Sequence, residues 1–190
     1  MTARRLLPLA IAFLVGSSLG TGYVYANHPW ICSGTTAYHY TPRTVGYNGP
    51  SAETSVSRPA SAYTGAYTRS INIWNPTVIN LTSGGTKLQL RYGAYGTNGW
   101  LGLATISGIS SCHIGLGKSQ LNDTYLRNTG TYSQTAVDHV ACQEVGHTFG
   151  LNHNRTSSTT CMNDTILTAG AQINQHDRDL LSSIYAHVPN

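Results

Sequence analysis

The feature that most constrains this chain is residues 138–154, where metal-binding residue types recur at helical spacing and then meet a glycine. Gln143 and His147 lie four residues apart, so on a helix they stack one turn above the other and point the same way. Glu144 lies on the rim of that face, where a carboxylate can take a proton from metal-bound water. The spacing therefore predicts a metal-binding helix with Glu144 as general base.

A sharp turn is predicted directly after this helix. Gly150 comes three residues after His147, where helices often end in a left-handed residue that glycine adopts without strain. A reversal there lets His153 approach the same ion from outside the helix. Such a ligand set leaves a position open for water, as catalytic zinc sites require.

Residues 143–153 resemble the zinc signature of the metzincin peptidases, His-Glu-x-x-His-x-x-Gly-x-x-His, in a matrixin-like version. They read Gln-Glu-Val-Gly-His-Thr-Phe-Gly-Leu-Asn-His. The resemblance implies a Zn²⁺ ion held by His147 and His153 with Gln143 as third ligand, and hydrolysis of peptide bonds with Glu144 as catalytic base. It is good over residues 132–187, and before residue 132 it rests on the order of elements alone.

Gln143 departs from this signature because the family has a histidine there. A glutamine amide is neutral and offers zinc only a weak oxygen donor. Three interpretations stay open: Gln143 binds zinc through its oxygen, a histidine from elsewhere fills the gap, or the metal is lost. His113 and His176 are possible donors, whereas His139 lies two helical turns from His147, about 12 Å of rise.

Met162 is the one methionine outside the first 26 residues. It resembles the metzincin Met-turn, in which a methionine packs beneath the metal-binding histidines without touching the ion. An ordinary core methionine is the alternative. Asp164 follows shortly after and is interpreted as a turn residue.

The N-terminal residues 1–26 have the pattern of a signal peptide. Arg4 and Arg5 precede an apolar run over residues 6–19, and small residues surround a cleavage point after Ala26. A membrane anchor is the weaker interpretation, because a span needs about 20 apolar residues. We therefore expect a secreted protein with one domain over residues 27–190.

Composition excludes several classes of partner. Only 9% of residues are charged, and the formal charge of +4 falls to +2 without Arg4 and Arg5, which carry two of those charges. No basic run remains, which disfavours binding to nucleic acid or to an anionic membrane surface. We expect a monomer whose partner is a peptide or protein substrate.

All four cysteines lie after the predicted cleavage point, and an even number in an exported chain indicates two disulfides. Three pairings are possible. We favour Cys142 with Cys161, which would tie the metal helix to the loop beneath the metal, leaving Cys32 with Cys112. A zinc site made of cysteines lacks the Cys-x-x-Cys pair that would support it.

Ahead of the metal helix, the pattern predicts a helix and a sheet. Residues 27–59 are rich in Gly, Pro, Ser, Thr and Tyr, which predicts mostly loop or N-terminal extension, with one strand at residues 37–41. Near-helical apolar spacing predicts a helix over residues 61–74. Alternating or apolar runs predict strands at residues 78–82, 87–92 and 100–106.

The remaining elements surround the metal helix. Residues 112–117 are predicted to be an edge strand, which in matrixin-like enzymes borders the substrate cleft, and residues 121–131 a polar connection. Ser133 or Thr135 could cap the metal helix. An apolar stripe predicts a closing helix over residues 175–186.

Together these features predict an α+β, metzincin-like (zincin) domain with a twisted mixed β-sheet, an active-site helix, a Met-turn and a C-terminal helix. The function that this implies is a secreted zinc endopeptidase. The rival from another class is a secreted peptide-binding module that keeps the scaffold and has lost turnover. A third interpretation gives the metal a purely structural role.

Overall fold

The computed structural model describes residues 29–189. The predicted signal peptide over residues 1–26 lies outside this range. Within the described part of the chain, no helix has both the length and the apolar character needed to cross a membrane.

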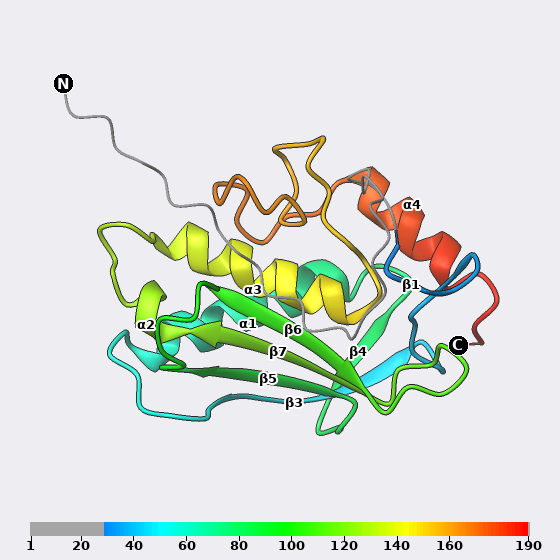
Figure 1. Cartoon of the computed structure of the whole chain (residues 1–190), viewed down its shortest axis with the longest axis horizontal. Coiled ribbons are helices and arrows are strands. Elements are labelled where there is room, and N and C mark those ends of the chain that lie inside the picture. Colours follow the sequence, from blue (N-terminus) through cyan, green and yellow to red (C-terminus); the bar gives the residue numbers. More distant parts are fainter. Residues whose placement is uncertain (1–28, 190) are drawn as a thin grey trace.

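A five-stranded sheet forms the base of the domain (Figure 1). Four of its strands run parallel, and the fifth, at one edge, is antiparallel to its neighbour. In spatial order the strands are β4 (Asn80–Ser83), β3 (Thr44–Ala52), β5 (Leu88–Gly93), β7 (Leu116–Asn122) and β6 (Gly102–Ser107). The mixed sheet and the strands predicted near β4, β5 and β6 are thus observed.

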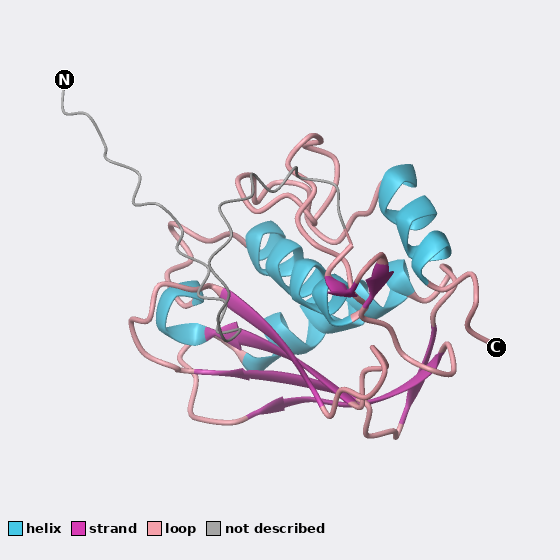
Figure 2. Ribbon diagram, turned by 45° about the vertical axis from the view of Figure 1, so that its right-hand side comes forward, coloured by secondary structure: helices cyan, strands magenta, loops and turns pink. Residues whose placement is uncertain are grey.

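Two long helices cover one face of this sheet (Figure 2). α1 spans Ala60–Trp74 and α3 spans Gln134–Thr148. α1 buries residues at helical spacing, among them Tyr63, Tyr67 and Trp74, which produces the apolar face that a packed helix needs. The predicted helix over residues 61–74 is confirmed.

Side chains of α1 also hold α3 through its backbone. The Trp74 indole Nε1 donates a hydrogen bond to the Cys142 carbonyl at 3.0 Å, and the Ser70 hydroxyl donates to the Ala141 carbonyl at 3.3 Å. These bonds fix the helix that carries the predicted metal ligands against its neighbour.

Two short elements complete the C-terminal half. α2 spans Asp123–Leu126, and the Asn122 side chain caps it by accepting from the Thr124 N–H. α4 spans Gln175–Ile184 and begins with a capping box between Asn174 and Asp177. The predicted closing helix is confirmed.

The N-terminal segment differs from the prediction. The structure builds β3 from residues that were expected to be loop. A small hairpin of β1 (Ile31–Ser33) and β2 (Thr36–Ala37) lies ahead of the strand predicted at residues 37–41, of which only Ala37 is in a strand. Glycines in β3 hide its pattern. A Cβ at Gly46 would lie 2.7 Å from the Gly85 Cα. Residue 46 is therefore glycine because two backbone segments pack closely here, and the strand lacks the alternation of apolar and polar side chains that would have revealed it.

The edge strand was also predicted in the wrong place. β7 begins at Leu116, lies between β5 and β6, and ends in the buried residues Leu121 and Asn122. Residues 111 and 112 instead have positive φ angles, 49° and 68°, and belong to a turn. The edge strand beside α3 is β6.

Two disulfides join distant parts of the domain. Cys142 of α3 is bonded to Cys161, and Cys32 of β1 is bonded to Cys112. This is the pairing that the sequence favoured. The first bond attaches the loop after α3 to the helix itself.

Candidate metal and catalytic site

α3 is an unusually buried helix, and this sets the chemistry of the side chains on it. Ser133 caps its start by accepting a hydrogen bond from the Ala136 N–H at 3.3 Å. From His139 to Thr148 every residue is buried, including Gln143, Glu144 and His147. Polar groups buried so fully need a partner or a ligand to offset their loss of water.

The chain reverses at Gly150, as the sequence predicted. Its φ angle is +90°, and a Cβ at this residue would overlap the Tyr38 carbonyl oxygen. The reversal brings His153 back to His147, with ring centroids 4.7 Å apart and the ring planes at 73°. The two imidazoles predicted to share an ion therefore lie together.

The Nδ1 atom of each imidazole faces an oxygen. His147 Nδ1 lies 2.8 Å from the Leu151 carbonyl, which can only accept, so Nδ1 carries the proton. His153 Nδ1 lies 3.4 Å from Asp164 Oδ2. Arrangements of this kind fix the tautomer of a metal-binding histidine and direct the Nε2 lone pair to the ion. Both Nε2 atoms are buried.

Asp164 is the member of this group of residues that the sequence did not reveal. It was interpreted as a turn residue, whereas its carboxylate faces His153 and is held by the Arg155 guanidinium through contacts of 2.7 and 2.5 Å. Arg155 keeps the pKa of Asp164 below its usual value, although burial opposes this. An acidic residue two positions after Met162 is the only signal in the sequence.

Burial keeps both imidazoles neutral. Loss of water, and then the nearby His153, lowers the pKa of His147 to about 3. Burial also lowers the pKa of His153, although Asp164 opposes that shift. Neutral imidazole is the form that binds a metal ion.

Glu144 lies between α3 and the edge strand. Burial raises the pKa of its carboxyl to about 8, and a hydrogen bond from the Ala104 backbone N–H in β6 partly opposes the shift. A Cβ at Gly102 would come within 2.6 Å of the Glu144 Cγ, so glycine in β6 leaves the room that this side chain fills.

Gln143 completes the group on α3. Its side chain is 3% exposed, and its Nε2 atom has no hydrogen-bond partner among the described residues. The oxygen and nitrogen of an amide exchange places by a half-turn, so the same buried position can present an oxygen. Two imidazole nitrogens and one amide oxygen fit the three protein ligands of a catalytic zinc site.

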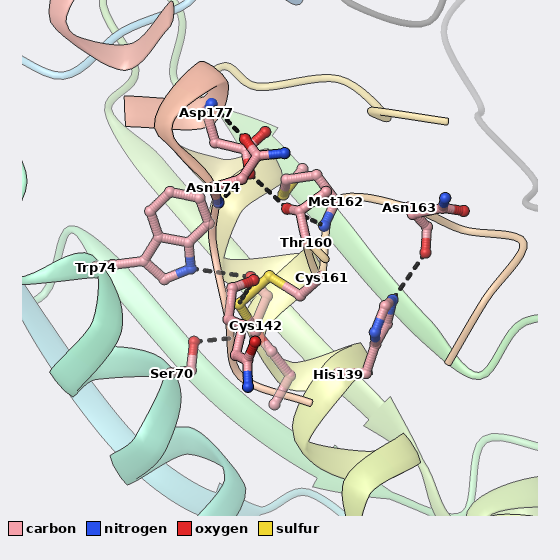
Figure 3. The surroundings of a disulfide bond; sticks show 12 residues. Ser70, Trp74, His139, Cys142, Thr160, Cys161, Met162, Asn163, Asn174 and Asp177 are labelled. Carbon is pink, nitrogen blue, oxygen red and sulfur yellow. Dashed lines mark hydrogen bonds between the residues drawn. A yellow bond between two sulfur atoms is a disulfide. The ribbon is translucent and has the colours of Figure 1, made fainter. Parts of the chain in front are cut away.

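No other histidine replaces Gln143 in this arrangement. His139 directs Nε2 to the Asn163 carbonyl at 2.8 Å (Figure 3), His113 packs against His39, and His176 is exposed on α4. Within residues 29–189, no set of three or more His, Cys, Asp or Glu side chains is placed to hold a metal ion. Gln143, one helical turn before His147 on α3, is therefore the remaining candidate for a third ligand.

Met162 lies beneath the helix at Gly146. It is fully buried, and a Cβ at Gly146 would come within 2.6 Å of its sulfur. The disulfide between Cys142 and Cys161 holds this methionine close to α3, as Figure 3 shows. Its position suits the apolar support predicted for a Met-turn.

Comparison with known proteins identifies a family. Residues 47–186 match the model of the metallo-peptidase family M12B, reprolysin-like. No curated protein matches the chain. Among solved structures, one titled "GM1 bound form of the ECX AB5 holotoxin" is similar with a TM-score of 0.47 and 15% identity, over 81% of this chain and 78% of that one.

His139 gives a prediction about stability and pH. Burial lowers its pKa, and its Nδ1 has no hydrogen-bond partner among the described residues. Below about pH 6.5, the unfolded chain takes up a proton that the folded chain resists, so stability present above that pH is lost on acidification. We expect His139→Gln, measured by urea unfolding with chelator present, to flatten the fall in unfolding free energy between about pH 7.5 and about pH 5.5. Parallel curves for the variant and the parent would contradict this.

Proposed function

Because the chain belongs to the metallo-peptidase family M12B, reprolysin-like, we propose that it is a secreted zinc-dependent endopeptidase whose Zn²⁺ is held by His147, His153 and Gln143. Glu144 is its general base. The matching family is reprolysin-like, and the matrixin-like subtype stays a prediction.

One observation carries the proposal. Two buried imidazoles face each other at 4.7 Å, and the Nδ1 of each is directed to an oxygen, from Leu151 for His147 and from Asp164 for His153. Packing alone gives no reason to bury two neutral imidazoles beside a buried amide and a buried carboxyl group. A shared cation accounts for this grouping, with the two imidazoles and the amide as its ligands and the carboxyl group beside it as the base.

The chemistry divides between the ion and Glu144. Bound zinc supplies a Lewis acid that polarises water and the scissile carbonyl. Glu144 takes the proton from the attacking water and delivers it to the leaving amide nitrogen. The buried carboxyl group holds that proton between the two transfers. Gly102 and the Ala104 N–H keep the carboxyl group in place throughout.

The substrate is an extended peptide or protein segment. β6 is the edge of the sheet and lies against α3 (Figure 1), so its outer side is beside the proposed metal ligands. An extended chain can pair with such an edge through backbone hydrogen bonds, which positions one peptide bond near the site with little demand on side chains. This replaces residues 112–117 as the strand that borders the cleft.

Two disulfides support export to an oxidising compartment, and the signal-like residues 1–26 would direct it. After cleavage the chain would carry few charges. We expect it to act as a monomer outside the cell.

The rival function is a peptide-binding module without turnover. Gln143 favours it, because an amide oxygen is a weaker zinc ligand than imidazole. The buried Glu144 favours the enzyme, because burying a carboxyl group costs stability that its one backbone hydrogen bond, from Ala104, only partly offsets.

Two substitutions distinguish these functions. We expect Glu144→Gln to keep bound zinc and to lower hydrolysis of casein or a peptide about 10²–10⁴-fold, because only the proton transfer is lost. Gln143→His should bind zinc more tightly than the parent. The measurements are zinc per chain and hydrolysis rate. Turnover that survives Glu144→Gln rules out the proposed base, and activity present only in Gln143→His supports the binding module.

Asp164 gives a second test at the same site. Asp164→Asn should weaken zinc binding about 10–100-fold, because the carboxylate that orients His153 is replaced by a neutral amide. Asp138→Asn is the matched control, since Asp138 on α3 pairs with Arg69 instead. Competition with a coloured chelator measures both affinities. Equal zinc affinity in the two variants would remove Asp164 from the site.

A further inference from the structure

A second group of histidines lies outside the proposed catalytic site. His39 stands between His113 and His187, with ring centroids 4.8 Å and 4.7 Å away. The Nε2 atoms of His39 and His187 are 3.3 Å apart, although 148 positions separate the two residues in the chain. No feature of the peptidase function uses this cluster.

The backbone around His39 is fixed from one side by the Cys32–Cys112 disulfide region. Its N–H donates to the Cys112 carbonyl at 3.1 Å, and its own carbonyl accepts from the Ile114 N–H at 2.7 Å. His39 therefore does not rely on His187 for its position.

The chain around His187 is held by contacts of the neighbouring residues. The Tyr185 hydroxyl accepts from the Tyr40 N–H at 3.0 Å, just before His187. Just after it, Arg43 Nε donates to the Val188 carbonyl at 2.7 Å. The two rings are thus held together by contacts that they do not themselves make.

The protonation of His39 is set by a carbonyl. His39 Nδ1 lies 2.8 Å from the Ala37 carbonyl, which can only accept, so Nδ1 carries the proton and Nε2 carries the lone pair. Burial lowers the pKa of His39, against the effect of this hydrogen bond, and the neighbouring histidines lower it further. The lone pair that faces His187 is therefore present at neutral pH.

The Nε2 to Nε2 distance matches a metal-binding pair. Two nitrogens bound to one tetrahedral zinc at about 2.0–2.1 Å lie about 3.3 Å from each other. The carbonyl on Nδ1 of His39 is also the usual outer partner of a metal-binding imidazole. We propose that His39 and His187 bind a divalent transition-metal cation such as Zn²⁺ through their Nε2 atoms.

Water completes the coordination. Within residues 29–189 no third His, Cys, Asp or Glu side chain joins the pair to form a full ligand set. His187 is exposed and lines a cavity of about 340 Å³ between α4 and the β1–β2 hairpin, so a hydrated cation can reach it. The site is a two-histidine clamp between the N-terminal and C-terminal segments.

Such a clamp stabilises the native state, because the unfolded chain does not hold the two rings together. A cation that binds only the folded chain raises the ratio of folded to unfolded molecules about 100-fold when its concentration is 100 times its dissociation constant. The effect adds to any stabilisation by zinc at His147 and His153.

The experiment follows the imidazole ¹⁵N resonances of the full mature protein during titration with ZnCl₂ at neutral pH, together with its thermal unfolding. Three proteins are compared: the parent, His187→Gln, and His176→Gln. The last is the matched control, because His176 is an exposed histidine on α4 outside the cluster. His147 and His153 give their own resonances, so failure of the catalytic site is seen separately.

We expect zinc to shift the Nε2 resonances of His39 and His187 together in the parent and in His176→Gln. In His187→Gln the His39 resonance should stay in place, and the part of the thermal stabilisation due to this site should disappear. Unchanged His39 and His187 resonances in millimolar zinc would show a hydrogen bond only and overturn the proposal. Equal stabilisation of all three proteins would overturn it as well.

Discussion

The structure depends on the burial of two neutral imidazoles whose Nδ1 atoms are directed to oxygens. His147 and His153 lose water on folding, and the Leu151 carbonyl and the Asp164 carboxylate compensate one nitrogen of each ring. The Nε2 atoms of both rings are buried as well, and Nε2 is the atom through which each ring would bind the proposed cation. The reversal at Gly150 brings the two rings together, and it requires glycine because a Cβ there would overlap the Tyr38 carbonyl oxygen.

The surrounding domain restrains the helix that presents these groups. α1 bonds to the backbone of α3 through Trp74 and Ser70, and the Cys142–Cys161 disulfide holds Met162 beneath it. On the opposite side, Gly102 of β6 admits the Glu144 carboxyl group. Rigid support on both sides suits a site in which small displacements of a base or ligand cost much of the rate. The fold therefore holds the proposed ligands and the proposed base between α1, the disulfide loop and β6.

Local patterns in the sequence were sufficient to predict those elements whose structure depends mainly on their own residues. The helix over residues 134–148, its Ser133 cap, the turn at Gly150 and the closing helix all follow from spacing and capping residues. Prediction from the sequence failed where contacts between residues far apart in the chain determine the structure. β3 contains Gly46 because it packs on Gly85, and β7 is central because of its pairing on both sides, neither of which any local pattern records. The contact between Asp164 and His153 was not predicted for the same reason, since it forms only when the loop that carries Asp164 folds back on His153.

The most direct measurement is a crystal structure of the zinc-loaded protein with anomalous scattering recorded at the zinc absorption edge. We expect an anomalous peak bonded to the Nε2 atoms of His147 and His153 and to the side-chain oxygen of Gln143, each at about 2.0–2.2 Å. A zinc peak that binds the two histidines while the Gln143 amide points elsewhere would contradict the proposed ligand set. Absence of zinc from this position in protein saturated with the metal would contradict the metallopeptidase function itself.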